Sequence, residues 1–151
     1  MSYRASVHAD ASFAQDTSGL AAAARAALAH ESAAPGDVSI VLTDEHRIRE
    51  MNRAYAGNDA PTDVLSFADG ETDPDSGRVY FGDVVICVPV AELQAAQSKH
   101  SLDDELALLT VHGILHLLGY DHARPAEQEK MWTAQDDILA KLSRPNIVGE
   151  S

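Results

Sequence analysis

The sequence predicts an α+β fold in which about four strands form a mixed sheet that packs against four or five helices. Three observations indicate this class. Short segments of alternating apolar and polar residues lie between longer segments whose apolar residues recur at helical spacing. The 151 residues contain no internal repeat and no long linker, so one compact domain is expected over residues 1–151. With 45% hydrophobic residues and only 5% aromatic ones, its core should be aliphatic.

Local pattern places five elements in the first part of the chain. They are a strand at 3–7, an alanine-rich helix from Thr17 or Ser18 to about His30, a strand at 38–42, a helix that ends near Gly57, and a short strand at 63–67. Thr43 can cap the second helix, because its hydroxyl can accept a hydrogen bond from a first-turn N–H. The acidic residues 68–77 are rich in turn-forming types, so we expect a solvated loop there.

The second part of the chain adds one strand and three helices. They are a strand at about 78–88, a helix from Pro89 to about Lys99, a helix at 102–118, and a last helix that begins at Pro125 and includes Leu142. Ser101 begins a pattern resembling a capping box for the helix at 102–118, and Gly119 can end it. Cys87 lies in the apolar strand, where we expect a buried and unreactive thiol.

The charge of the chain limits the classes of function. Eleven Lys and Arg against 24 Asp and Glu give a formal net charge of −13, which argues against a protein that coats nucleic acid. A nucleic-acid substrate would need a local basic cleft. The sequence has no apolar run of about 20 residues and no signal peptide at its beginning, so a cytoplasmic location without membrane contact is expected.

Three histidines within eleven residues are the strongest functional signal. His112 and His116 are one helical turn apart, about 6 Å along the axis, so both imidazoles project from one face and can bind one ion. Gly119 can take a positive φ and let the backbone fold back, so that His122 supplies a third nitrogen. The sequence therefore predicts a metal site on the helix and the turn that follows it.

Three neutral nitrogens without a fourth Cys or His suit one zinc ion with an open position, as in catalytic sites. Zinc lowers the pKa of bound water to about 7, so that water is the expected catalytic group. Nickel or copper would also accept three imidazoles. Asp121 can either orient a ligand histidine or form the turn.

A zinc peptidase is one alternative, because metzincin proteases share the spacing H-x-x-x-H-x-x-G-x-x-H. In those enzymes a glutamate follows the first histidine and activates water, whereas this chain has Gly113. Glu105 lies two turns before His112, about 10 Å along the axis and too far to contact the bound water. We interpret Glu105 as a favourable first-turn charge.

Residues 112–122 match the signature H-G-x-L-H-L-x-G-Y-D-H of the YbeY family of bacterial ribosomal-RNA maturation factors. Residues 52–67, which include Pro-Thr-Asp-Val-Leu-Ser-Phe, resemble that family's segment N-x-x-Y-R-x-x-D-x-P-T-D-V-L-S-F, and Gly82-Asp83-Val84 resembles its G-D-I strand. The similarity covers most of Val38–Leu142.

The resemblance implies a compact α+β fold with zinc on His112, His116 and His122. It implies a metal-dependent hydrolase, namely a single-strand-specific endoribonuclease in the maturation and quality control of small-subunit ribosomal RNA. Single-stranded ribosomal RNA, the small ribosomal subunit and its assembly factors are the implied partners. A non-catalytic, zinc-stabilised ribosome-assembly factor is the second hypothesis, and a metallopeptidase the third.

One residue departs from the family pattern. Ala56 stands where the family has an arginine thought to serve phosphate binding or catalysis. Arg49 and Arg53 lie on the same predicted helix and can supply the missing charge in a basic cleft that they share with the metal, although a solvated basic helix face is the preferred interpretation. Asp83 is a candidate general base, although an aspartate satisfied in a loop explains it as well.

Overall fold

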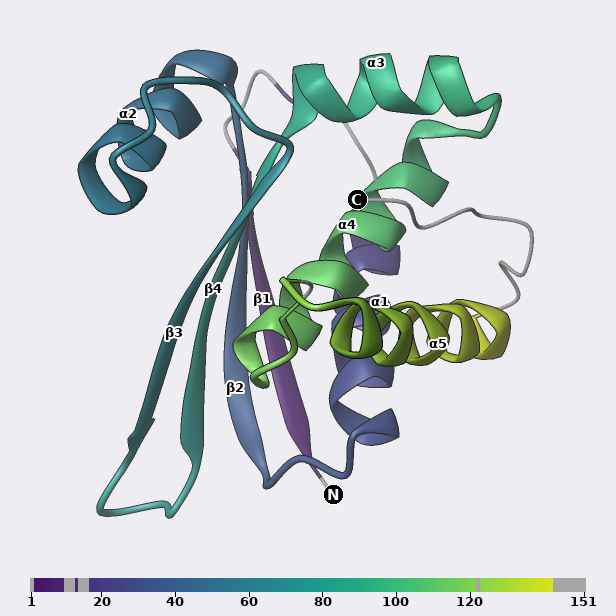
Figure 1. Ribbon diagram of the computed structural model, residues 1–151. Coiled ribbons are helices and arrows are strands. Elements are labelled where there is room, and N and C mark those ends of the chain that lie inside the picture. The colour runs from purple at the N-terminus through teal and green to yellow at the C-terminus, as the bar shows by residue number, and fades with distance from the viewer. Residues whose placement is uncertain (1, 10–12, 14–16, 122, 143–151) are drawn as a thin grey trace.

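The computed structural model describes residues 2–9, 13, 17–121 and 123–142 (Figure 1). The strands are β1 (Tyr3–Ala9), β2 (Gly36–Thr43), β3 (Val64–Thr72) and β4 (Val79–Cys87). The helices are α1 (Ser18–His30), α2 (Glu45–Ala56), α3 (Val88–Ser98), α4 (Leu102–Leu117) and α5 (Pro125–Lys141). The predicted α+β class is confirmed, with four strands and five helices in the described part of the chain.

The four strands form one mixed sheet in the order β1-β2-β4-β3. Strands β1, β2 and β4 run parallel to one another, and β3 pairs antiparallel with β4. Strand β3 is therefore an edge strand, and its outer side faces away from the rest of the sheet (Figure 1).

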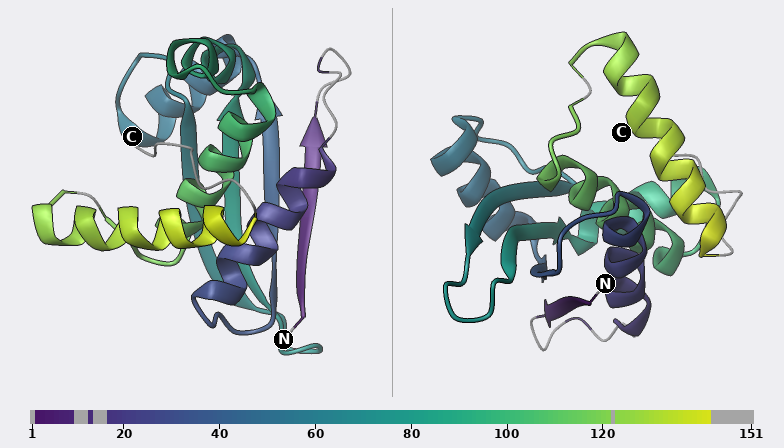
Figure 2. Two further views of the ribbon diagram at one scale, coloured as in Figure 1. Left: turned by 90° about the vertical axis from the view of Figure 1, so that its right-hand side faces the viewer. Right: turned by 90° about the horizontal axis from the view of Figure 1, so that it is seen from below.

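Helices lie on both faces of the sheet, but unequally. Helices α1 and α4 cover one face, and α5 packs outside them (Figure 2). Successive residues of β4 point to opposite faces. Val84 and Ile86 belong to the main core with α1 and α4, whereas Val85 and Cys87 join Ile48 of α2 in a smaller cluster on the other face.

Two glycines allow the strands to approach closely where β2 and β4 begin to pair. The register shifts between Asp37 and Val38, so that Phe81 is an extra residue in β4. A Cβ on Gly36 would lie 2.3 Å from the carbonyl oxygen of Val79, and one on Gly82 would lie 2.1 Å from that of Phe67. No larger residue fits either position without a shift of backbone.

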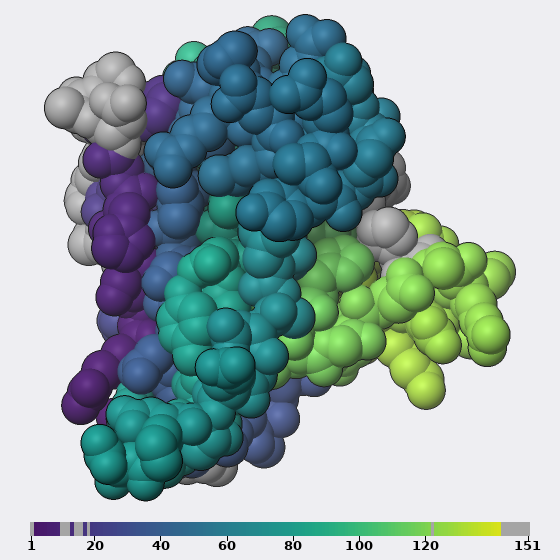
Figure 3. Space-filling model, turned by 90° about the vertical axis from the view of Figure 1, so that its left-hand side faces the viewer, coloured from purple at the N-terminus to yellow at the C-terminus, as the bar shows by residue number. Residues whose placement is uncertain are grey.

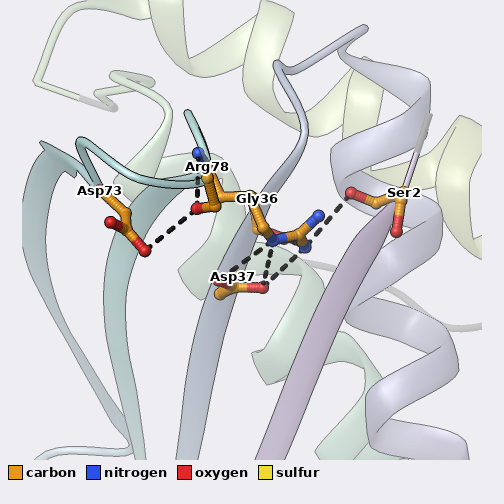
Figure 4. Close-up of polar contacts among 6 residues, drawn as sticks. Ser2, Gly36, Asp37, Asp73 and Arg78 are labelled. Carbon is orange, nitrogen blue, oxygen red and sulfur yellow. Dashed lines mark hydrogen bonds and ion pairs between the residues drawn. The ribbon is translucent and has the colours of Figure 1, made fainter.

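Arg78 joins the same ends of three strands (Figure 4). Its Nη2 donates to Asp37 Oδ1 at 2.7 Å and to the carbonyl oxygen of Gly36 at 2.9 Å. It also lies 3.5 Å from the carbonyl oxygen of Ser2, just before β1. The Asp37 carboxylate raises the pKa of Arg78.

Two local expectations were wrong. The cap of α2 is Asp44, whose side chain accepts a hydrogen bond from the N–H of Arg47 at 2.8 Å, and not Thr43, which is the last residue of β2. Strand β3 continues to Thr72 where a loop was expected, because Glu71 and Thr72 pair with Tyr80 and Val79 after a register shift.

Other expectations fit the structure. Cys87 is buried at 0% exposure, and burial raises the pKa of its thiol. Leu142 packs against the core, as the sequence predicts. Within the described residues, no helix combines the length and the apolar character that crossing a membrane requires.

Candidate active site

A cleft of about 770 Å³ opens between β3, α3 and α4. Figure 3 shows α4, in green, reaching the surface beside β3, in teal. The cleft is lined by Thr62, Asp63, Val64, Leu65, Ser66, Ala68, Gln94, Gln97, Ser98, Glu105, Leu108, His112, His116 and Leu117. The histidine helix therefore forms one wall, and the edge strand forms the other.

Two of the predicted metal ligands meet in this cleft. The Nε2 atoms of His112 and His116 are 3.1 Å apart, and the ring centroids are 4.6 Å apart with the planes inclined by 74°. His112 is only 3% exposed. The helical spacing therefore brings both imidazoles to one point, as the sequence predicts.

The other nitrogen of each ring has a partner that fixes the tautomer. His116 Nδ1 lies 2.9 Å from the carbonyl oxygen of Tyr120, so this nitrogen carries the proton and donates it. His112 Nδ1 lies 3.1 Å from Oε1 of Gln135, which is completely buried in α5. With both Nδ1–H groups donating, the two Nε2 lone pairs face each other, an arrangement that a cation stabilises.

Tyr120 itself is held by the end of α1. Its hydroxyl donates to the Glu31 carboxylate, and this hydrogen bond, together with burial, raises the pKa of Tyr120 to about 12. Glu31 also contacts His30 Nδ1 at 2.7 Å. The turn after α4 is thus anchored to α1 through Tyr120, whose carbonyl oxygen orients His116.

The donor set fits a zinc ion. Two nitrogens at about 2.0–2.1 Å from a tetrahedral zinc lie about 3.3 Å apart, close to the 3.1 Å between the two Nε2 atoms. His122, the third predicted ligand, lies outside the described residues, so a three-histidine site stays a prediction. Asp121 forms the turn, because its Oδ1 accepts a hydrogen bond from the N–H of Ala123 at 3.0 Å.

Gly113 brings α4 close to the sheet. A Cβ at this position would lie 2.5 Å from Cγ1 of Val84 and 3.3 Å from Oγ of Ser66. Ser66 Oγ donates to the carbonyl oxygen of Gly113 at 3.0 Å, across the same contact. A side chain at position 113 would point into the sheet, where Val84 and Ser66 leave no room for it, so a metzincin-type glutamate does not fit there.

Glu105 lies in the first turn of α4, as the sequence predicts, but it is buried there. It is 3% exposed and lines the cleft, and its Oε1 lies 2.6 Å from Nε2 of His100. Burial raises the pKa of Glu105, and His100 opposes this change. Leu106 and Leu109 are fully buried on the same helix, which is apolar on most sides, and the carboxylate is buried with them.

The structure does not bring Arg49 and Arg53 to the histidines. Both side chains are exposed on α2, and neither lines the cleft. Arg49 Nε donates to Asp59 Oδ1 at 2.7 Å, and this contact lowers the pKa of Asp59 and raises that of Arg49. Ala56, also exposed, is the last residue of α2 and lies outside the cleft lining.

Asp83 lies on the opposite face of the sheet from the histidines. Its neighbour Val84 packs toward Gly113, and alternate residues of a strand point to opposite faces. The Tyr80 hydroxyl donates to Asp83 and also contacts Ser39. Asp83 is therefore satisfied within the sheet and does not reach the cleft.

Sequence reasoning missed Gln135 and the contribution of Asp63 to the cleft. A signal existed for Gln135, because it occupies a core-facing position between Met131 and Ile138, at the helical spacing of buried residues. Asp63 belongs to the motif at residues 52–67 that supports the family resemblance, but the residue pattern of this motif alone assigns no chemistry to Asp63.

The fold and the site together define an α+β protein with a pair of converging histidines in an open cleft. The family model described as Endoribonuclease YbeY matches residues 6–143, so the chain belongs to this family.

Named relatives agree with the family model. A protein of Moorella thermoacetica named Endoribonuclease YbeY is 49% identical over 122 residues, which cover 76% of this chain and 78% of that protein. A protein of the same name from Geobacillus kaustophilus is 48% identical over 113 residues, which cover 70% of this chain and 72% of that protein. The solution structure of TM1509 from Thermotoga maritima covers 95% of this chain and 93% of its own with a TM-score of 0.59; at 23% identity it supports the fold alone.

Proposed function

We propose that this protein is a zinc-dependent endoribonuclease that cleaves single-stranded RNA during maturation and quality control of small-subunit ribosomal RNA. One observation carries the proposal: the two Nε2 atoms of His112 and His116 converge at 3.1 Å in an open cleft of a chain from the endoribonuclease YbeY family.

In this proposal, some residues would bind the metal and others orient the metal ligands. His112, His116 and His122 would hold the zinc ion, which supplies a Lewis acid able to polarise a phosphoryl oxygen or activate water. Gln135 and the carbonyl oxygen of Tyr120 keep the first two rings in the tautomer that directs Nε2 into the cleft.

The partners proposed are single-stranded ribosomal RNA and the small ribosomal subunit with its assembly factors, in the cytoplasm. The family resemblance supports this choice, and the net charge of −13 restricts how RNA can bind. The described residues that line the cleft include neither Lys nor Arg, so the positive charge for the phosphate backbone would come from a metal held by the histidines and not from the side walls.

A second candidate function is a zinc-stabilised ribosome-assembly factor without turnover. Two observations favour it over a nuclease: Ala56 lacks the charge of the family arginine, and the described residues that line the cleft include no guanidinium. The peptidase hypothesis loses support because position 113 faces the sheet, where a catalytic glutamate cannot be placed.

The test measures zinc content and the cleavage of single-stranded RNA, double-stranded RNA and a denatured protein. We expect stoichiometric zinc, cleavage of single strands only, loss of both in His112→Ala, and faster cleavage in Ala56→Arg. His46→Ala is the matched control, because His46 is an exposed histidine on α2 outside the cleft.

Each other outcome selects a different function. Stoichiometric zinc without cleavage of either polymer supports the assembly factor, and cleavage of the protein substrate supports a peptidase. A zinc-free protein whose activity and stability do not respond to a chelator rejects the metal site.

A further inference from the structure

Strand β3 has one edge that no other strand of the described residues covers. It is the last strand in the order β1-β2-β4-β3, so only its inner edge pairs with β4 (Figure 1). The first part of β3 also lines the cleft, through Val64, Leu65, Ser66 and Ala68. The open edge therefore belongs to the same stretch of strand that forms a wall of the cleft opposite the histidine helix.

The hydrogen bonds to β4 show which residues of β3 face outward. The N–H of Cys87 donates to the carbonyl oxygen of Asp63 at 2.9 Å, and the register of the strands places these two residues opposite each other. Hydrogen-bonded and non-hydrogen-bonded positions alternate along an antiparallel pair. Val64, Ser66 and Ala68 therefore direct their main-chain groups away from β4.

Most of these outward groups are available to a partner. In the described part of the chain, no main-chain hydrogen bond joins Ser66 or Ala68 to an element outside the sheet. The N–H of Val64 is occupied, because Asp63 Oδ1 accepts its hydrogen bond at 2.8 Å. The register shifts between Ala68 and Glu71. The regular open edge thus runs over residues 64–68, a length of about 14 Å.

Contacts on both faces hold this edge in place. The hydroxyl of Ser66 donates to the carbonyl oxygen of Gly113 at 3.0 Å, which ties the strand to α4. Leu65 and Phe67 pack in the smaller cluster on the other face of the sheet. A partner therefore meets a strand that is already ordered, and only the partner loses conformational freedom on binding.

An extended polypeptide is the ligand that matches such an edge. Its main chain presents N–H donors and carbonyl acceptors at the spacing of a strand, and added strands bind exposed sheet edges through these groups. The sugar–phosphate chain of RNA carries no N–H donors. Asp63 and Glu105 line the cleft, and the described lining residues include neither Lys nor Arg, so a basic segment is favoured over an acidic one.

We propose that the outer edge of β3 at residues 64–68 binds a lysine- or arginine-rich segment of a partner protein in extended form, as an added strand of the sheet. This interaction goes beyond the proposed nuclease function, and it requires neither metal nor turnover. Because the same residues line the cleft, the bound segment would occupy space that RNA needs to reach the histidines.

Binding of short peptides to the full chain tests the edge. The probe is a fluorescein-labelled hexapeptide of alternating lysine and threonine, and the comparison peptide has glutamate in place of lysine. We expect the basic peptide to bind at least about tenfold more tightly at low salt, with the difference shrinking as salt screens the charges. Amide hydrogen exchange of Ser66 and Ala68 should slow in the complex, because the added strand covers their N–H groups.

Methylation of the peptide main chain separates strand pairing from charge attraction. Two probes of equal charge carry N-methyl groups on the lysine nitrogens or on the threonine nitrogens. Successive residues of a strand direct their N–H groups to opposite edges, so only one of the two sets faces β3. One probe should lose at least about tenfold in affinity while the other binds as the unmethylated peptide does. Equal affinities of the two methylated probes overturn the proposal.

Variants of the chain assign the binding to this edge. Ala68→Pro removes an outward N–H, which an edge strand tolerates, and should weaken the basic peptide, whereas Ala68→Val keeps the N–H and is the matched control. Asp63→Asn removes a charge but keeps the oxygen that accepts from Val64, and it should weaken binding at low salt. Glu92→Gln is its control, because Glu92 is exposed on α3 outside the cleft lining.

The outcomes separate the edge from the proposed nuclease function. Peptide affinity that is unchanged in both Ala68→Pro and Asp63→Asn, or exchange at Ser66 and Ala68 that does not slow, overturns the added strand. Peptide binding by a chain that cleaves no RNA supports the edge and rejects the nuclease. RNA cleavage by a chain that binds none of the peptides rejects the edge alone.

Discussion

The Nδ1 atom of His112 lies 3.1 Å from Oε1 of Gln135, inside the core between α4 and α5. Gln135 is completely buried, so its amide oxygen is committed to the interior of the protein. The contact keeps the proton on Nδ1 and leaves the Nε2 lone pair directed toward His116. A glutamine on the last helix thus determines which ring nitrogen of His112 is available to a ligand.

Gln135→Met removes the acceptor while it preserves the length of the side chain. We expect zinc affinity to fall about 10- to 100-fold, because partners of ligand histidines have effects of this size. Competition with a chromophoric chelator measures the affinity. Gln128→Met, at a half-buried position near the start of α5, is the control. An unchanged affinity in Gln135→Met would show that the contact does not orient the ring.

Gly113→Ala should destabilise the fold. The new Cβ would lie 2.5 Å from Val84 Cγ1, and overpacking of this kind costs about 1–3 kcal/mol, whereas replacing a helical glycine with alanine gains about 1 kcal/mol at most. The cost of overpacking therefore exceeds the gain in helix propensity, and urea unfolding should show a lower free energy of unfolding for the variant than for wild type.

A double-mutant cycle with Val84→Ala locates the cause. The smaller residue at 84 makes room for the new methyl group, so the double variant should be more stable than the sum of the two single changes predicts, by about 1 kcal/mol. Additive effects would place the cost of Gly113→Ala elsewhere.

Arg78→Lys should lower the melting temperature more than Arg49→Lys does. Both arginines pair with an aspartate, but Arg78 also donates to main-chain oxygens at the ends of β1 and β2, with 15% of its side chain exposed. Arg49 and Asp59 are each 55% exposed, and such pairs contribute little. Lysine cannot reproduce the guanidinium fork. Equal shifts in the two variants would contradict this prediction.

Glu105 makes stability depend on pH in an unusual direction for a carboxyl group. Burial raises its pKa above the ordinary value of 4.5, so the folded state holds the proton more tightly than the unfolded state does. Its contribution to stability is full below 4.5 and is lost as the pH rises through the raised pKa, at up to about 1.4 kcal/mol per pH unit.

Glu105→Gln cannot ionise and should escape this loss. The stability of the variant relative to wild type should therefore increase as the pH rises from 4.5, measured by urea unfolding in a pH series. Asp103→Asn, at an exposed position of the same helical turn, should show no such trend. A stability difference that is constant with pH would mean that Glu105 ionises equally easily in both states.

The fold was predictable because its elements have consistent local signals. The end of α2 is an example, since Gly57 adopts a φ of 69° as a helix-terminating glycine does. Strand β3 was predicted too short because Gly70 and its acidic neighbours favour a turn locally. Pairing with Tyr80 and Val79 on β4 overrides that preference, and such pairing is invisible in a single segment.

The histidine pair was predictable because both residues lie on one helix, where spacing fixes geometry. Asp83 was misplaced because the face to which a strand residue points depends on which helices cover the sheet. The prediction that Arg49 lies near the metal was wrong for a similar reason. Its position on a helix does not reveal that α2 lies away from the cleft or that Asp59 binds the guanidinium. The contact of Gln135 with His112 could not be predicted, because it depends on how α5 packs on α4.

The contact between His112 and Gln135 spans 23 residues of sequence. During synthesis, the first histidine therefore emerges from the ribosome well before the amide that orients it. Until α5 docks, the Nδ1–H of His112 lacks the acceptor that Gln135 provides. A chain that ends before α5 would keep both histidines of α4 but lose the group that orients the first of them.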